Sequence, residues 1–162
     1  TDLSKIITNV GSFQYLKSFT NKNNILAIFN LELSGIGDVL YFATKSGLVN
    51  CNENLINFLE FVSKKENIKY LKLPILNSDM ISIHTLSLKG VVYGAIPEYE
   101  GKNYSMSINE QINREKMPSI WKNIHSNRDN FFSIQEKALS NVYEFTLKII
   151  ENINELERFI QV

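Results

Sequence analysis

The side chains of this 162-residue chain that could do chemistry are two histidines, several acidic residues and one cysteine. Imidazole is the commonest metal ligand and titrates near neutral pH, so His84 and His125 are candidates for both roles. Neither histidine belongs to a close pair such as H-x-x-x-H or H-E-x-x-H, and spacing alone assigns no Ser-His-Asp order. Chemistry alone therefore favours a structural role for both histidines.

Glu32 ends the apolar run ILAIFNLE and precedes Ser-Gly. Ligands of open α/β sheets gather outside the carboxyl ends of strands, where Glu32 would lie, although a solvated strand end is the simpler interpretation. The following SGIGDV lacks the third glycine and the helix of a dinucleotide-binding loop. The single Cys51 excludes an internal disulfide and a cysteine metal cluster, and we interpret it as a small apolar residue.

Apolar patterns predict the helices and strands that carry these residues. Strands are expected at Ile25 to Glu32, Val39 to Thr44, Tyr70 to Leu76 and Val91 to Glu98. Two of these runs show little polar alternation, which is typical of strands covered on both faces. The pattern predicts an α/β fold with a layered mixed β-sheet flanked by helices.

Helices are predicted at Asn52 to Lys65, with Asn52 as its N-cap, and at Ser133 to Ile160. In the second helix Ser133 and Glu136 are expected to form a capping box, and apolar residues recur every three or four positions: Ala138, Val142, Phe145, Ile149, Ile153, Leu156 and Ile160. The first twenty residues are expected to include a helix that buries Leu16 and Phe19. The polar stretch from Gly101 to Arg128 is interpreted as a long loop with at most one helical turn.

Composition limits the class of protein. Hydrophobic residues make up 44% of the chain and charged residues 21%, which predicts one folded domain over residues 1–162. Seventeen basic residues balance seventeen acidic ones without clustering, so no nucleic acid partner is expected. No apolar run is long enough to span a membrane, and the sequence gives no indication of a cellular compartment.

Five short motifs follow one another along the chain. They are Gly11-Ser12, NLELSGIGD around Glu32, Ser78-Asp79, GVVYGAIPE from Gly90, and HSNRD from His125. In this order the chain resembles the C-terminal half of the zinc-dependent aminopeptidase domain shared by bacterial leucyl aminopeptidases, glutaminyl cyclases and the transferrin receptor ectodomain. The resemblance implies a zinc-exopeptidase-like fold (phosphorylase/hydrolase-like), truncated at its N-terminus.

The resemblance also implies roles for particular residues. Glu32 takes the place of an aspartate metal ligand and His125 that of the last histidine ligand, so both are expected to face one cleft. Asp79 would lie near the floor of the site and Asp129 would be the acid that follows the histidine. Asp38, from the neighbouring Gly-Asp pair, is a further candidate for the surroundings of the metal site.

Departures from the family pattern are equally informative. The first histidine ligand and the bridging aspartate have no counterpart here, and the expected Glu-Glu pair, which includes the general base, falls on Lys5 and Ile6. A stable zinc site needs three or four protein ligands, and this chain supplies one recognisable position per ion. We therefore predict that the chain binds no stoichiometric zinc.

Two functional interpretations remain. In the first, the chain is a portion of a metallopeptidase domain that removes N-terminal residues from peptide substrates, inactive as this chain alone. In the second, it is a non-catalytic relative that serves as a scaffold or interaction module, with a protein partner or a homo-oligomer.

Overall fold

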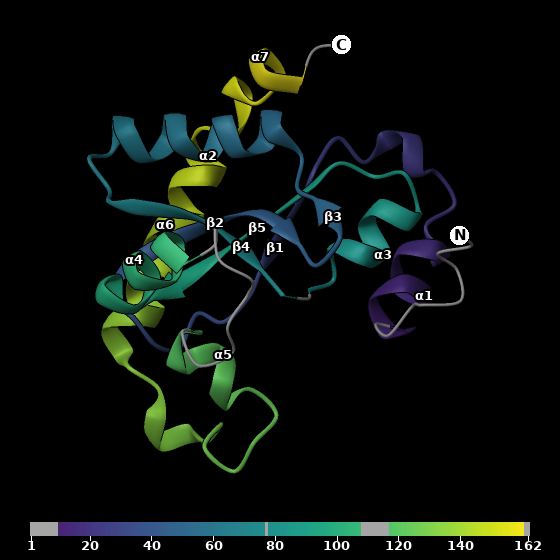
Figure 1. Ribbon diagram of the computed structural model, residues 1–162. Helices are drawn as coiled ribbons and strands as arrows, with labels where there is room; N and C mark the ends of the chain where they lie inside the picture. The colour runs from purple at the N-terminus through teal and green to yellow at the C-terminus, as the bar shows by residue number, and fades with distance from the viewer. Residues whose placement is uncertain (1–9, 77, 108–116, 161–162) are drawn as a thin grey trace.

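The computed structural model describes residues 10–76, 78–107 and 117–160, whose strands form one mixed sheet flanked by helices (Figure 1). The strands are β1 (Ile28–Leu31), β2 (Val39–Ser46), β3 (Val49–Asn50), β4 (Tyr70–Ile75) and β5 (Gly90–Ile96). The order is β1-β5-β2-β3, and β4 pairs with β2. Since β1 is parallel to β5, β4 parallel to β2, and β5 antiparallel to β2, the predicted mixed α/β sheet is confirmed.

All four predicted strands form, but the first is shorter than expected. β1 begins at Ile28 because its partner β5 begins only at Gly90, and the ladder opens with Ile28 N donating to Lys89 O at 2.9 Å. A short 3-10 helix, η2 (Lys22–Asn24), precedes it. The prediction missed β3, which forms a tight hairpin with the end of β2.

The predicted helix after Asn52 is confirmed as α2 (Glu53–Lys65). The Asn52 side chain accepts a hydrogen bond from the backbone N–H of Leu55 at 3.1 Å, which satisfies one of the free donors in the first turn. Leu55, Leu59 and Val62 lie on one face of the helix and are fully buried.

The last predicted helix is divided, and its capping box is wrong. The 3-10 helix η4 (Phe131–Ser133) precedes α6 (Glu136–Glu151), which is followed by η5 (Ile153–Glu155) and α7 (Glu157–Ile160). The Ser133 hydroxyl donates to Asn130 O at 2.7 Å, and the residue before α6 is Gln135. The predicted apolar positions of α6 are buried, whereas Ile153 is exposed because η5 interrupts the helical period.

Two other helices correct the predictions. The expected loop from Gly101 contains most of α4 (Glu98–Ser107), and α3 (Met80–Thr85) was also missed, whereas the short α5 (Ser119–Asn123) agrees with the one helical turn that the loop prediction allowed. α4 is polar and packs through Gly101 and Tyr104, so it lacks an apolar period that sequence analysis could detect. Near the N-terminus α1 (Val10–Ser18) buries Leu16, but Phe19 lies beyond its end and is 40% exposed.

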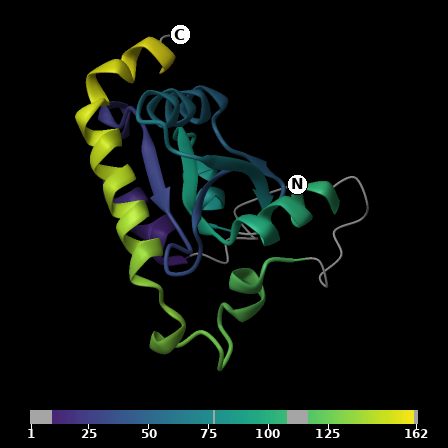
Figure 2. The same cartoon turned by 90° about the vertical axis from the view of Figure 1, so that its left-hand side faces the viewer.

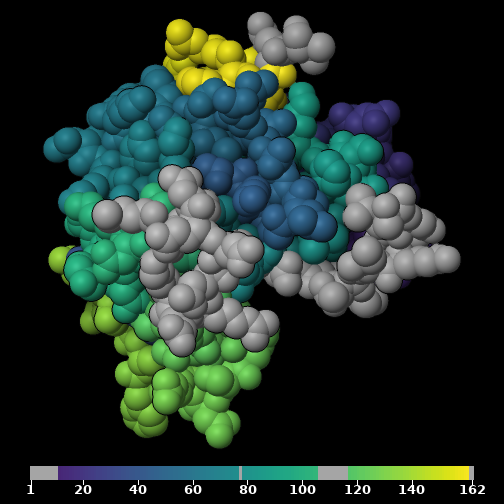
Figure 3. Space-filling model, viewed as in Figure 1, coloured from purple at the N-terminus to yellow at the C-terminus, as the bar shows by residue number. Residues whose placement is uncertain are grey.

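Helices cover both faces of the sheet. On one face α2 and α6 meet the strands through aromatic contacts: Phe29 with Phe58, and Phe42 and Tyr93 with Phe145. α3, α4 and α5 lie on the other face, where Tyr41 packs against Trp121. Figure 2 shows α6 running along the outer side of the sheet, beside β1. The segment that contains α5 and η4 forms the lower part of the molecule in Figure 3.

Candidate functional site

A cleft of about 430 Å³ opens at the carboxyl end of β1. It is lined by Leu31, Glu32, Leu33, Ser78, Asp79, Ile124 and His125. Three of the residues assigned by resemblance, Glu32, Asp79 and His125, therefore lie around one cleft although they come from distant segments. The expected convergence of Glu32 and His125 is observed.

The backbone of Glu32 is held against the middle of the sheet. Its N–H donates to Tyr93 O at 3.0 Å, and its carbonyl accepts a hydrogen bond from the hydroxyl of the fully buried Tyr41 at 3.1 Å. Gly94 permits this approach, because a Cβ at that position would lie 1.9 Å from Glu32 O. A glycine inside an apolar strand often marks such a close approach of backbones.

The Glu32 carboxylate is half-buried and hydrogen-bonded through one oxygen. Oε1 accepts from Asn30 Nδ2 at 3.0 Å and from the backbone N–H of Asp79 at 3.2 Å. Burial raises the pKa of the Glu32 carboxyl above its ordinary value and the charge of Asp79 adds to this, while the two hydrogen bonds lower it. Within the described part of the chain, Oε2 has no hydrogen-bond donor.

Asp79 connects the cleft to the N-terminal helix. Its Oδ1 accepts a hydrogen bond from the Ser12 hydroxyl at 2.9 Å, and Ser12 Oγ also lies 3.0 Å from Ser82 Oγ. Ser78, which precedes Asp79, bonds through its hydroxyl to Ser46 Oγ at 2.8 Å. The Gly-Ser and Ser-Asp motifs, matched in the sequence by their order alone, thus meet beside Glu32.

His125 lies on an exposed turn that Asp129 stabilises. The backbone N–H of His125 donates to Asp129 Oδ2 at 3.2 Å, so this carboxylate holds the turn in shape. His125 and Leu33 both have positive φ angles, 58° and 53°. Such backbone strain in non-glycine residues often accompanies functional sites, and both of these residues line the cleft.

The other candidates lie elsewhere. Asp38 accepts a hydrogen bond from the backbone N–H of Glu98 at 2.8 Å, so it supports the start of α4. His84 is exposed in the last turn of α3 and does not line the cleft. Cys51 is buried, and burial raises the pKa of its thiol to about 11, consistent with its interpretation as a small apolar residue.

The side chains that line the cleft do not supply the ligands of the zinc centre that the resemblance implies. Across residues 10–76, 78–107 and 117–160, no group of three or more His, Cys, Asp and Glu side chains is arranged to hold a metal ion. One oxygen of Glu32 and one of Asp79 are already engaged with protein donors. Lys5 and Ile6 lie outside the described residues, and the prediction about stoichiometric zinc stays a prediction.

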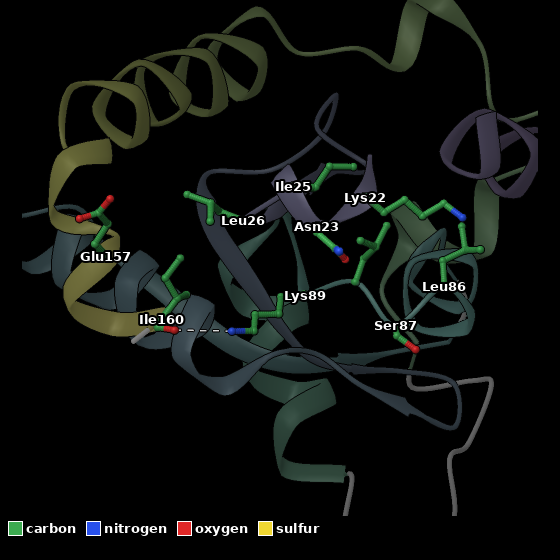
Figure 4. A pocket seen from close by; sticks show the side chains of 10 residues that line it. Lys22, Asn23, Ile25, Leu26, Leu86, Ser87, Lys89, Glu157 and Ile160 are labelled. Carbon is green, nitrogen blue, oxygen red and sulfur yellow. Dashed lines mark hydrogen bonds between the residues drawn. The ribbon is translucent and has the colours of Figure 1, made fainter. Parts of the chain in front are cut away.

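A larger pocket of about 590 Å³ lies at the opposite end of β1 (Figure 4). Lys22 and Glu157 stand on different sides of it, and Lys89 Nζ donates to Ile160 O at 3.5 Å. Its polar groups do not converge on one point, so the smaller cleft is the better candidate for a functional site.

Sequence analysis missed the residues that support the site. Tyr41 and Gly94 hold the Glu32 backbone, and Leu33 and Ile124 supply apolar walls. Only Gly94 left a signal, as a glycine within an apolar strand.

Among the described residues, every helix is too short or too polar to span a lipid bilayer. Comparison with protein-family models, with curated proteins and with solved structures finds no match to the chain. The site therefore has to be interpreted from its own chemistry: a half-buried carboxylate with one unengaged oxygen, a second carboxylate beside it, and a histidine at the rim.

Proposed function

We propose that the chain is a portion of a zinc-dependent aminopeptidase-like domain that binds the amino-terminal end of a peptide in this cleft without cleaving it. The observation that carries the proposal is the meeting of Glu32, Asp79 and His125 around one cleft, with Ser12 hydrogen-bonded to Asp79. The four residues belong to four of the motifs that carry the family resemblance, and their convergence is what supports the proposal.

The chemistry of the cleft suits an ammonium group. Glu32 Oε2 lies in a half-buried setting, where a charge-assisted hydrogen bond is stronger than in water. A cation placed there would also offset the repulsion between the carboxylates of Glu32 and Asp79. The apolar walls formed by Leu33 and Ile124 would accommodate the first side chain of the peptide.

Hydrolysis is not part of the proposal. In the family that the chain resembles, a metal-bound water attacks the peptide bond and a glutamate acts as base. The described residues do not fit the zinc centre, and the sequence has Lys5 and Ile6 at the Glu-Glu positions. The proposal therefore combines the family fold with the non-catalytic interpretation.

The test is a calorimetric titration of the chain with a short peptide that has a free amino terminus, matched against its N-acetylated form. A charge-assisted hydrogen bond contributes about 1.5–3 kcal/mol, so we expect the free peptide to bind at least about tenfold more tightly. Glu32→Gln is the matched variant, because its amide oxygen retains both hydrogen bonds of Oε1 while the charge is lost. The variant should bind the two peptides equally.

Two outcomes would contradict the proposal. One is equal binding of the free and acetylated peptides by the unmodified chain. The other is release of product from aminoacyl chromogenic amides by the purified chain, since this would require a working catalytic centre.

A further inference from the structure

The two edges of the sheet differ in their protection against pairing. Edge strands expose unpaired backbone groups, and proteins commonly protect them with lysine or proline. β4 carries Lys72 and Pro74, and Lys72 forms an ion pair with Glu60 at 2.6 Å. Among the described residues β1 pairs only with β5, and the stretch from Ile25 to Leu31 has no charged residue and no proline. The β1 edge lacks the protection of the β4 edge.

α6 and α7 run alongside this unprotected strand. At the carboxyl end of β1, the N–H of Gln135 donates to Gly35 O at 2.8 Å. At the other end, Leu26 and Ile160 line the same pocket, as Figure 4 shows. Between these points the hydroxyls of Thr146 and Tyr93, the residue paired with Leu31, lie 2.9 Å apart.

The flank of α6 that faces away from α2 is apolar and exposed. The α2 side of the helix is marked by Lys148 near Glu66 and by Asn152 bonded to Lys65. The opposite flank and the edge strand together form what we call the edge patch: Leu26, Leu31, Leu139, Tyr143, Leu147 and Ile150. Tyr143 is 65% exposed and Ile150 is 59% exposed, although both are large apolar side chains.

We propose that the edge patch is the interface of a symmetric homodimer, in which β1 pairs antiparallel with β1 of a second copy and the two α6 helices pack beside the joined sheet. A two-fold interface brings the same surface of both copies together. An edge strand is its own complement in an antiparallel pair, because the open N–H and C=O groups of each copy face those of the other, and β1 has such an open edge among the described residues. This self-complementarity is the reason to favour a second copy as the partner.

The size of the patch agrees with this assignment. Six side chains at about half exposure present on the order of 500 Å² of apolar surface in each copy, so two copies would bury on the order of 1,000 Å², close to the lower limit for a specific interface. Strand pairing adds backbone area and brings the total towards the roughly 800 Å² per subunit of a standard interface.

The experiment measures the molecular mass of the chain by sedimentation or light scattering over a range of concentrations. It compares two variants that make the same substitution, tyrosine to lysine, at different positions. Tyr143→Lys places a charge in the edge patch, twice per dimer, whereas Tyr99→Lys places it on α4, where Tyr99 is 78% exposed. We expect Tyr143→Lys to weaken the dimer at least about tenfold and Tyr99→Lys to leave it unchanged. Ile150→Lys repeats the test at a second position if Tyr143→Lys impairs folding.

Amide hydrogen exchange provides a second readout. Ile28 N and Glu32 N donate to β5, so by alternation the amides of Phe29 and Leu31 point to the open edge. In the dimer these two amides should be protected, and Tyr143→Lys should remove the protection. A chain that stays monomeric at all concentrations, including one that forms a complex only with a different protein, would overturn the proposal. So would a dimer that Tyr143→Lys and Ile150→Lys leave intact.

Discussion

Replacing Gly94 by alanine should destabilise the fold and displace Glu32. The added Cβ would lie 1.9 Å from Glu32 O and 2.9 Å from Tyr41 Cε1, so the chain after β1 must move by about 1.5 Å to restore ordinary contact. Overpacking of this kind costs about 1–3 kcal/mol, and loss of the Tyr41 to Glu32 hydrogen bond about 1 kcal/mol more. We expect the free energy of unfolding to fall by about 2–4 kcal/mol, out of a typical total of about 5–15 kcal/mol.

Urea denaturation measures this change as a shift in the midpoint urea concentration, provided that the slope of the free energy of unfolding against urea concentration is unchanged. Gly35→Ala is the control, since a Cβ there would meet only the Ile134 side chain, at 3.6 Å. This control should remain within about 0.5 kcal/mol of the original chain. Equal stability of Gly94→Ala and Gly35→Ala would refute the reasoning, because the backbone of Glu32 would then not depend on the close approach to Gly94.

Four further changes have defined outcomes. The pKa of the Glu32 carboxyl is higher in the folded chain than in the unfolded chain, so the folded chain binds more protons at pH values between the two. The free energy of unfolding should therefore fall as the pH rises through this range. Glu32→Gln should remove this fall and stabilise the chain at neutral pH, as urea denaturation at several pH values would reveal. Phe145 is a fully buried residue of α6 whose ring packs against Phe42 of β2 and Tyr93 of β5. Phe145→Ala should lower the free energy of unfolding in urea by about 3–5 kcal/mol, and a decrease of less than about 1 kcal/mol would contradict the place of this ring in the core. Asn52→Ala should cost about 1 kcal/mol by the same measurement, while Asn52→Asp should retain the cap. Elemental analysis should find no stoichiometric zinc; tight zinc binding that is lost in both Glu32→Ala and His125→Ala would show that a metal centre exists.

Secondary structure was predictable where a pattern is local and strong. β2 and β5 are continuous apolar runs, and α2 combines an N-cap with an apolar stripe, so each was found near its true bounds. α4 was missed because its packing depends on Gly101, whose Cβ position lies 2.7 Å from Leu71 Cδ1, and not on an apolar period. The capping box at Ser133 was wrong because the hydroxyl bonds back to Asn130 instead.

The class of fold and the residue types available for a site can be inferred from the sequence alone, because apolar periodicity and side-chain chemistry are properties of short segments. The tertiary structure brings Glu32, Asp79 and His125 to one cleft, whereas Asp38 supports α4. It also decided that the uncharged β1 lies at an open edge beside an apolar flank of α6, among the residues described. Strand order and helix placement depend on how distant segments pack, and no local pattern in the chain specifies which segments meet.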